Sequence, residues 1–86
     1  MQDTKRYIIK LNKVEELKAG RSLNYIAGLT DFSRQYLSEV FLRKRVISSK
    51  NARRIAKSLC EDVVYLYNFL NKEGIDNVID YFFEKV

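Results

Sequence analysis

The chain has 86 residues and a net charge of +5, with one cysteine and no histidine. It is long enough for one domain with one core, and its composition excludes disulfide frameworks, Cys/His metal sites and histidine-dependent triads. No apolar run of about 18 residues and no basic-then-apolar leader is present, so we expect a cytoplasmic protein without a membrane span.

Apolar residues that recur three and four positions apart predict a chain made of helices. The first helix should end near Ala19, where Gly20 can take the left-handed conformation that follows many helices. The sequence allows two starting points for this helix. We prefer a start at residues 3–4, and the alternative is a start at Asn12, with residues 7–11 as an extended arm.

Two serines predict the starts of the next two helices. Ser22 is placed to cap a short helix over residues 23–29. Ser33 is placed to cap a helix over residues 33–42. The apolar residues of this helix are spaced to share one buried stripe: Leu37, Val40 and Phe41.

Three more helical segments are expected in the C-terminal half. Ser48 or Ser49 caps a fourth helix, and Asp62 opens a fifth that ends at Gly74. Asp76 can cap a last segment, either a helix or a short strand. The inward positions should be Ala52, Ile55, Ala56 and Leu59 in the fourth helix and Val63, Leu66, Tyr67 and Leu70 in the fifth.

The stretch between the second and third helices has the residues that a tight helix crossing needs. Two helices joined at a steep angle by a short turn require a small residue at the contact, a turn residue that tolerates positive φ, and an apolar anchor. Ala27, Asp31 and Leu37 meet these three needs in that order. The spacing therefore predicts a helix-turn-helix unit.

From about residue 20 to residue 70 the chain resembles the Cro and phage-repressor type (XRE-like) of helix-turn-helix protein. Ile26-Ala27 corresponds to the small-residue end of the second helix, and Thr30-Asp31 to the turn. Ser33 corresponds to the cap of the recognition helix, and the run Arg43-Lys44-Arg45 to the basic loop after it. The resemblance implies an all-α fold of five helices with an additional C-terminal helix or short strand.

That resemblance divides the chain into a DNA-binding domain, residues 1–74, and an extension, residues 75–86. The sequence departs from the family pattern at three positions. Asp31 and Arg43 stand where glycine is usual, and Leu23 stands where a phosphate-binding glutamine is common. Asp tolerates the left-handed region, so the turn should survive, whereas the recognition helix could run further without its glycine.

The resemblance implies which side chains face DNA. The base-reading positions are Ser33, Arg34, Gln35, Ser38 and Glu39. Arg34 can bond guanine with both arms, Gln35 can bond adenine, and Glu39 can accept from cytosine. The expected phosphate contacts are Ser22, Asn24, Tyr25, Arg43, Lys44 and Arg45. Arg53, Arg54 and Lys57 are interpreted as the solvent-exposed side of the fourth helix.

Charge supports a nucleic-acid partner. Residues 1–60 carry 14 Lys and Arg against 5 Asp and Glu, a balance of +9, whereas residues 61–86 carry 2 against 6, a balance of −4. The basic part should attract a polyanion. Together with this charge balance, the resemblance implies a sequence-specific regulator of transcription, of the repressor type, that binds an inverted repeat in double-stranded DNA as a homodimer.

The C-terminal segment is the expected dimer contact, formed by Ile75, Val78, Ile79, Phe82 and Phe83. In the alternative, these residues close the core of the monomer. The alternative function is a protein-interaction module, antitoxin-like or repressor-modulating. No nucleophile and base pair presents itself, so we expect no enzyme and no cofactor. Cys60 should be a buried or half-buried, inert thiol.

Overall fold

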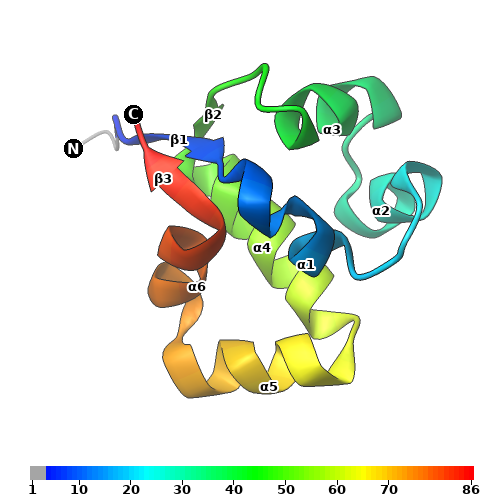
Figure 1. The fold of residues 1–86 in the computed structure, drawn as a ribbon, viewed down its shortest axis with the longest axis vertical. Helices are drawn as coiled ribbons and strands as arrows, with labels where there is room; N and C mark the ends of the chain where they lie inside the picture. Colours follow the sequence, from blue (N-terminus) through cyan, green and yellow to red (C-terminus); the bar gives the residue numbers. More distant parts are fainter. Residues whose placement is uncertain (1–3) are drawn as a thin grey trace.

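A computed structural model describes residues 4–86, which form helices around a small three-stranded sheet (Figure 1). The helices are α1 (Val14–Lys18), α2 (Leu23–Thr30), α3 (Arg34–Phe41), α4 (Ser49–Glu61), α5 (Val64–Glu73) and α6 (Ile75–Phe82), with a 3-10 turn at Leu11–Lys13. The strands are β1 (Arg6–Ile9), β2 (Ile47–Ser48) and β3 (Phe83–Lys85). The described part of the chain is thus mostly helical, as expected, and it also contains a small sheet that the all-α prediction did not include.

The sheet has the order β2-β1-β3, and both pairings are antiparallel. Tyr7 lies opposite Ile47 on one side and Lys85 on the other, and Ile9 lies opposite Phe83. Both Tyr7 and Ile9 are buried, as expected for alternate residues of a strand that covers a core.

The preferred long first helix is therefore wrong, and the alternative with an extended arm is confirmed. Residue 3, where that helix was to begin, lies outside the described residues. Tyr and Ile favour strands, and here the strand acquires partners from two distant segments. The predicted capping box at Asn12 does not form, since neither the 3-10 turn nor α1 has a side-chain cap.

Three serines begin helices, as the sequence indicates. The Oγ atoms of Ser22 and Ser33 accept hydrogen bonds of 3.1 Å from the backbone N–H groups three residues on. Ser48, rather than Ser49, caps α4 through a 3.2 Å bond from the N–H of Asn51. Each cap satisfies a donor that the first turn of a helix leaves without a backbone partner.

Helix α3 does not run past its predicted end. Leu42 follows the last residue of α3, and Arg43 takes a left-handed conformation with φ of 62°. The N–H of Lys44 donates to the carbonyl of Glu39, and that of Arg43 to the carbonyl of Val40. This is the Schellman arrangement, in which Arg43 has the conformation that glycine usually supplies.

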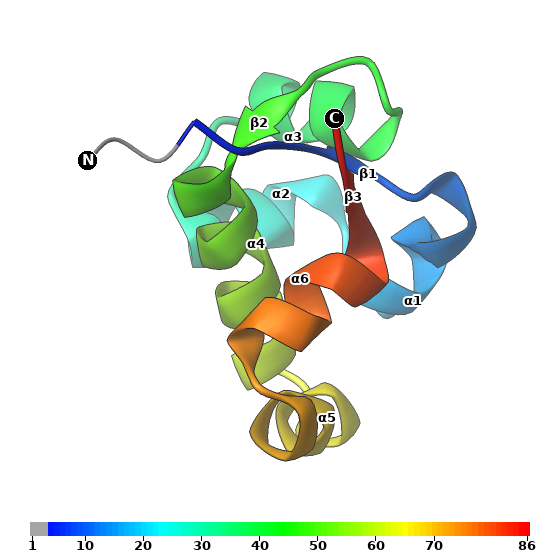
Figure 2. The same ribbon diagram turned by 90° about the vertical axis from the view of Figure 1, so that its left-hand side faces the viewer.

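Helix α4 is the centre of the core. It contacts α1, α2, α5 and α6 as well as β1 and β2. Its predicted inward residues, Ala52, Ile55, Ala56 and Leu59, are all buried. Figure 2 shows α3 and the sheet at one end of the molecule and α5 at the opposite end.

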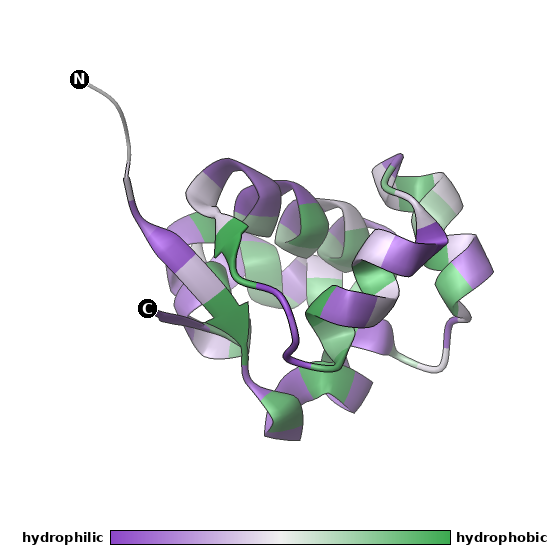
Figure 3. Ribbon diagram, turned by 90° about the horizontal axis from the view of Figure 1, so that it is seen from above, coloured by the Kyte–Doolittle hydropathy of each residue, from purple (hydrophilic) through white to green (hydrophobic). Residues whose placement is uncertain are grey.

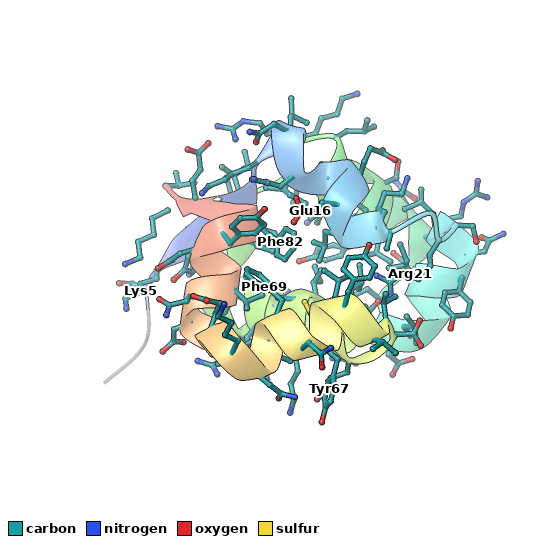
Figure 4. All side chains as sticks on the ribbon, turned by 60° about the horizontal axis from the view of Figure 1, so that its bottom comes forward. Lys5, Glu16, Arg21, Tyr67, Phe69 and Phe82 are labelled. Carbon is teal, nitrogen blue, oxygen red and sulfur yellow. The ribbon has the colours of Figure 1, made fainter. Side chains whose placement is uncertain are left out.

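Helix α5 differs from the prediction in its inward side. It begins at Val64, two residues after the predicted start. Leu66 and Leu70 are buried, but Tyr67 is 45% exposed. Phe69 packs inward instead, with its ring centroid 5.0 Å from that of Tyr81 (Figure 4). The interpretation of Tyr67 as an inward residue is therefore wrong.

The C-terminal segment forms both a helix and a strand, and it closes the core. Val78, Ile79, Phe82 and Phe83 are buried inside the single chain, and Ile75 is partly buried. Asp76 does not cap α6, because Gly74 precedes the helix and no side-chain cap forms. The five residues assigned to a dimer contact thus pack on their own chain, as in the alternative prediction.

Candidate nucleic-acid interface

The α2–α3 connection is a turn of three residues. Asp31 has a φ of 65°, the left-handed conformation that the sequence predicts for it. The hydroxyl of buried Thr30 donates to the carbonyl of Ile26 at 2.9 Å, so the last turn of α2 has an added bond. Leu37 is fully buried and anchors α3 in the core. These contacts set the direction of α3.

One side of α3 lies in the core and the other faces outward. Leu37, Val40 and Phe41 are buried, as predicted. An open depression beside the outer side is lined by Leu23, Arg34, Gln35, Ser38 and Glu39. Four of the five predicted base-reading residues are thus brought together. The fifth, Ser33, uses its Oγ to cap the helix.

Leu42 extends this outward side by one turn, and the sequence analysis missed it. It follows Ser38 by four residues, the spacing that places two residues on the same helix face. Its side chain is 57% exposed, which is unusual for a leucine beside polar residues. The helical spacing of positions 35, 38, 39 and 42 was the signal that could have found it.

Glu39 is engaged with a second predicted DNA contact. Its Oε1 accepts hydrogen bonds from Nε and from one NH2 group of Arg45, both at 2.8 Å. The guanidinium of Arg45 also lies over the ring of Tyr36, 4.9 Å from the ring centroid. The sequence analysis assigned Glu39 to a base and Arg45 to a phosphate, and the structure places them against each other.

The basic loop divides into two parts. Arg43 donates to the carbonyl of Ile9 at 2.8 Å and forms an ion pair with Glu84, so this arginine joins the loop to the sheet. Lys44 and Arg45 are exposed on the hydrophilic segment between α3 and β2 (Figure 3). Of the three predicted phosphate contacts in the loop, Arg43 is thus the one held by the sheet.

The first turn of α2 holds the other predicted phosphate contacts. Ser22 caps the helix, and Asn24 is exposed. The hydroxyl of Tyr25 donates to the carboxylate of Asp62, at 3.0 and 3.1 Å. This hydrogen bond to the carboxylate raises the pKa of Tyr25 above its ordinary value. Tyr25 is half-exposed but turned toward the start of α5.

Arg21 is a structural residue that the sequence analysis missed. Its guanidinium donates to the carbonyls of Leu17 and Lys18 at the end of α1, both at 2.8 Å. The same group donates to the carbonyl of Leu59 at 2.9 Å and pairs with Asp62 at 3.2 Å. Only 10% of its side chain is exposed. Arg21 therefore closes the carboxyl ends of two helices.

Other kinds of site find little support. Within residues 4–86, no group of three or more metal-binding side chains is arranged to hold an ion. Cys60 is buried, as predicted, and burial raises the pKa of its thiol to about 11. No helix in that range combines the length and apolarity needed to cross a membrane.

The outer side of α3 thus gathers Arg34, Gln35, Ser38 and Glu39 around one open depression. The resemblance to Cro and phage repressors stays a prediction, based on the order and spacing of the motifs around α2 and α3. Comparison of the chain with models of protein families, with curated proteins and with solved structures gave no match.

Proposed function

We propose that the protein binds double-stranded DNA sequence-specifically, with α3 in the major groove as the recognition helix of a helix-turn-helix unit. The observation that carries this proposal is the two-sided nature of α3. Its inner side is fixed in the core, and its outer side presents Arg34, Gln35 and Ser38 around an open depression. A rigid helix with polar groups on one face suits the width of the major groove.

The exposed side chains have the chemistry of base readout. Arg34 can donate two hydrogen bonds to O6 and N7 of a guanine, and Gln35 can bond N6 and N7 of an adenine. Leu42 can contact the methyl group of a thymine. Lys44 and Asn24 lie on the two flanking segments and suit phosphate contacts, which supply affinity without sequence choice.

The charge distribution supports a duplex that binds against α3. Residues 61–86 have the acidic balance, and they form α5, α6 and β3. Helix α5 lies at the end of the molecule opposite to α3 (Figure 2). A duplex against α3 would meet Arg34, Lys44 and Arg45 of the basic part, with α5 on the far side, while Glu84 of the acidic part lies at the α3 end and is paired with Arg43.

A role in repressing transcription as a homodimer on an inverted repeat follows the same resemblance. Two recognition helices would have to read half-sites about 34 Å apart. Because the apolar side of α6 is buried in the monomer, the proposed dimer contact lies on another surface of the protein. Sedimentation of the protein with a duplex carrying one or two half-sites measures the stoichiometry.

Selection of bound duplexes from a random pool, followed by binding titrations, tests the proposal. Arg34→Ala should relax the preference at one base pair, by about 1–3 kcal/mol. Lys44→Ala should weaken all duplexes alike. Arg53→Ala is the matched control, because this exposed arginine pairs with Asp76 on α6. Enrichment of no sequence at physiological salt would refute sequence-specific binding.

A second candidate, the protein-interaction module, has one observation in its favour. A groove beside α1 and α3 is lined mostly by apolar side chains, among them Leu11, Val14, Phe41 and Leu42. The apolar side of α6 is buried and offers this candidate no docking surface. Capture of a specific partner by a protein that shows no salt-dependent DNA binding would favour this candidate.

A further inference from the structure

Arg45 is held beside α3 by two different interactions. Its guanidinium lies over the ring of Tyr36 and donates to the carboxylate of Glu39 at 2.8 Å. The ring is itself fixed, since its hydroxyl accepts a 2.9 Å hydrogen bond from the side-chain amide of Asn51 on α4. The position of Arg45 is therefore set in advance of any partner.

Arg54 on α4 repeats this arrangement on the other side of the same aromatic pair. Its guanidinium lies 4.8 Å from the ring centroid of Phe32 and 3.6 Å from the carboxylate of Asp31. The rings of Phe32 and Tyr36 are in contact, with centroids 4.9 Å apart. Arg54, Phe32, Tyr36 and Arg45 thus form a continuous arginine–aromatic row along the start of α3.

Stacking on a ring leaves the N–H donors at the edge of a guanidinium free to bond oxygen atoms. Phosphate oxygens accept from this fork in the same way as carboxylate oxygens. Both arginines remain 46% exposed, so a larger anion can reach them.

We propose that Arg45 and Arg54 clamp the DNA backbone on one side of α3, and that Glu39 and Asp31 hold their guanidinium groups until phosphates replace the carboxylates. This inference rests on the proposed function and deepens it. It assigns Arg54 a binding role, in place of its interpretation as a merely solvated residue. It also makes Glu39 a residue that positions Arg45 and competes with phosphate, instead of a base reader.

The two roles of Glu39 predict opposite effects on DNA binding when its carboxylate is removed. A base reader that loses its carboxylate loses preference at one base pair. A competitor that loses its charge frees Arg45 and removes repulsion of the backbone. Glu39→Gln should therefore raise the affinity for every duplex by about two- to fivefold, the range expected for removing one exposed ion pair.

The experiment measures fluorescence anisotropy of short duplexes of random sequence at about 50–200 mM KCl. Arg45→Ala and Arg54→Ala should each reduce the slope of log affinity against log salt by about 1. Arg53→Ala should leave the slope unchanged, because Arg53 is on α4 but outside the row. Phe32→Leu should weaken binding, and adding it to Arg54→Ala should cost little more.

A gain in affinity with Glu39→Gln and a reduced slope with Arg54→Ala support the clamp. If Glu39→Gln instead lowers affinity or relaxes a single base pair, Glu39 reads DNA and the inference is overturned while the proposed function stands. An Arg54→Ala slope equal to that of Arg53→Ala also overturns it. Absence of salt-dependent duplex binding by the unaltered protein overturns both.

Discussion

Single side chains of this chain hold distant elements together through chemistry that sequence spacing does not reveal. Arg21 is the main example, because its planar group bonds carbonyl oxygens from α1 and from α4 at once. The sequence shows an arginine after a glycine, which is compatible with an ordinary solvated residue. Only the approach of Leu59 and Asp62, about 40 residues later, makes Arg21 structural.

Arg21→Ala should lower the free energy of unfolding by about 2–4 kcal/mol, because it leaves partly buried carbonyls and a carboxylate without their charged donor. Urea denaturation measures the change. Arg53→Ala removes an exposed ion pair and should cost less than about 1 kcal/mol. Equal losses in the two variants would contradict the structural role of Arg21.

The buried thiol of Cys60 should make the stability of the protein fall as the pH rises. Burial raises the pKa of its thiol from 9.0 to about 11, so the folded state keeps the thiol neutral where the unfolded state ionises it. The contribution of the neutral thiol to the free energy of unfolding is complete below about pH 9 and is lost as the pH rises toward 11. Over that interval this thiol lowers stability by up to about 1.4 kcal/mol per pH unit.

Urea denaturation at several pH values between these limits, on the unaltered protein and on Cys60→Ala, isolates the effect of the thiol. Other groups titrate in the same interval, so the readout is the difference between the two pH slopes. The variant should lose stability less steeply. Parallel slopes would show that the thiol titrates alike in the folded and unfolded states.

At the scale of elements, the serine caps were predicted well, whereas the capping box at Asn12, the cap at Asp76 and the strand pairings were not. The caps at Ser22 and Ser33 depend on atoms within three residues, and both are confirmed. Strand β1 depends on Ile47 and Phe83, whose positions the sequence near residue 7 does not encode. A stretch such as Tyr7-Ile8-Ile9 is compatible with a helix until those partners are known.

The candidate site shows the same division. The outer residues of α3 could be placed by helical spacing, since the cap and the buried stripe fix the phase of the helix. The pairing of Glu39 with Arg45 could not, because it depends on the path of the loop. Arg43 directs that path through its left-handed backbone and its bond to Ile9.

Arg43 also allows a test of the end of α3. Arg43→Gly and Arg43→Ala lose the same contacts to Ile9 and Glu84, but only glycine removes the left-handed strain. The glycine variant should therefore be more stable than the alanine variant by about 1 kcal/mol, measured by thermal denaturation. At Lys44, which has no positive φ, glycine should be no better than alanine.

For the whole molecule, the uneven charge along the chain is only partly a separation in space, because α3 and α5 lie at opposite ends whereas β3 brings Glu84 of the acidic segment back to Arg43 (Figure 2). The role of the C-terminal segment could not be chosen from the sequence. A stripe of Val, Ile and Phe suits an interface and a core equally, and the choice depends on whether α4 leaves room for it. Here α4 and α6 pack together.

Phe82→Ala tests that role directly. The ring is fully buried within the chain, so its loss should lower the free energy of unfolding by about 3–5 kcal/mol. Sedimentation should show the oligomeric state of the remaining folded protein unchanged. Tyr67→Ala is the control, since its exposed ring should cost little stability. Dissociation of an oligomer without loss of stability would contradict this role and show that Phe82 lies in an interface between chains.

The pairing of β1 with β3 bears on how the chain reaches its fold. Strand β1 pairs with β3, whose residues 83–85 lie far along the chain from residues 6–9. Native contacts between such distant residues slow folding, because a large loop must close before they contribute. The helices of the α2–α3 unit can form first, while the edge of β1 stays open to other strands. The outer side of α3 should therefore take shape before the sheet that fixes the loop after it through Arg43.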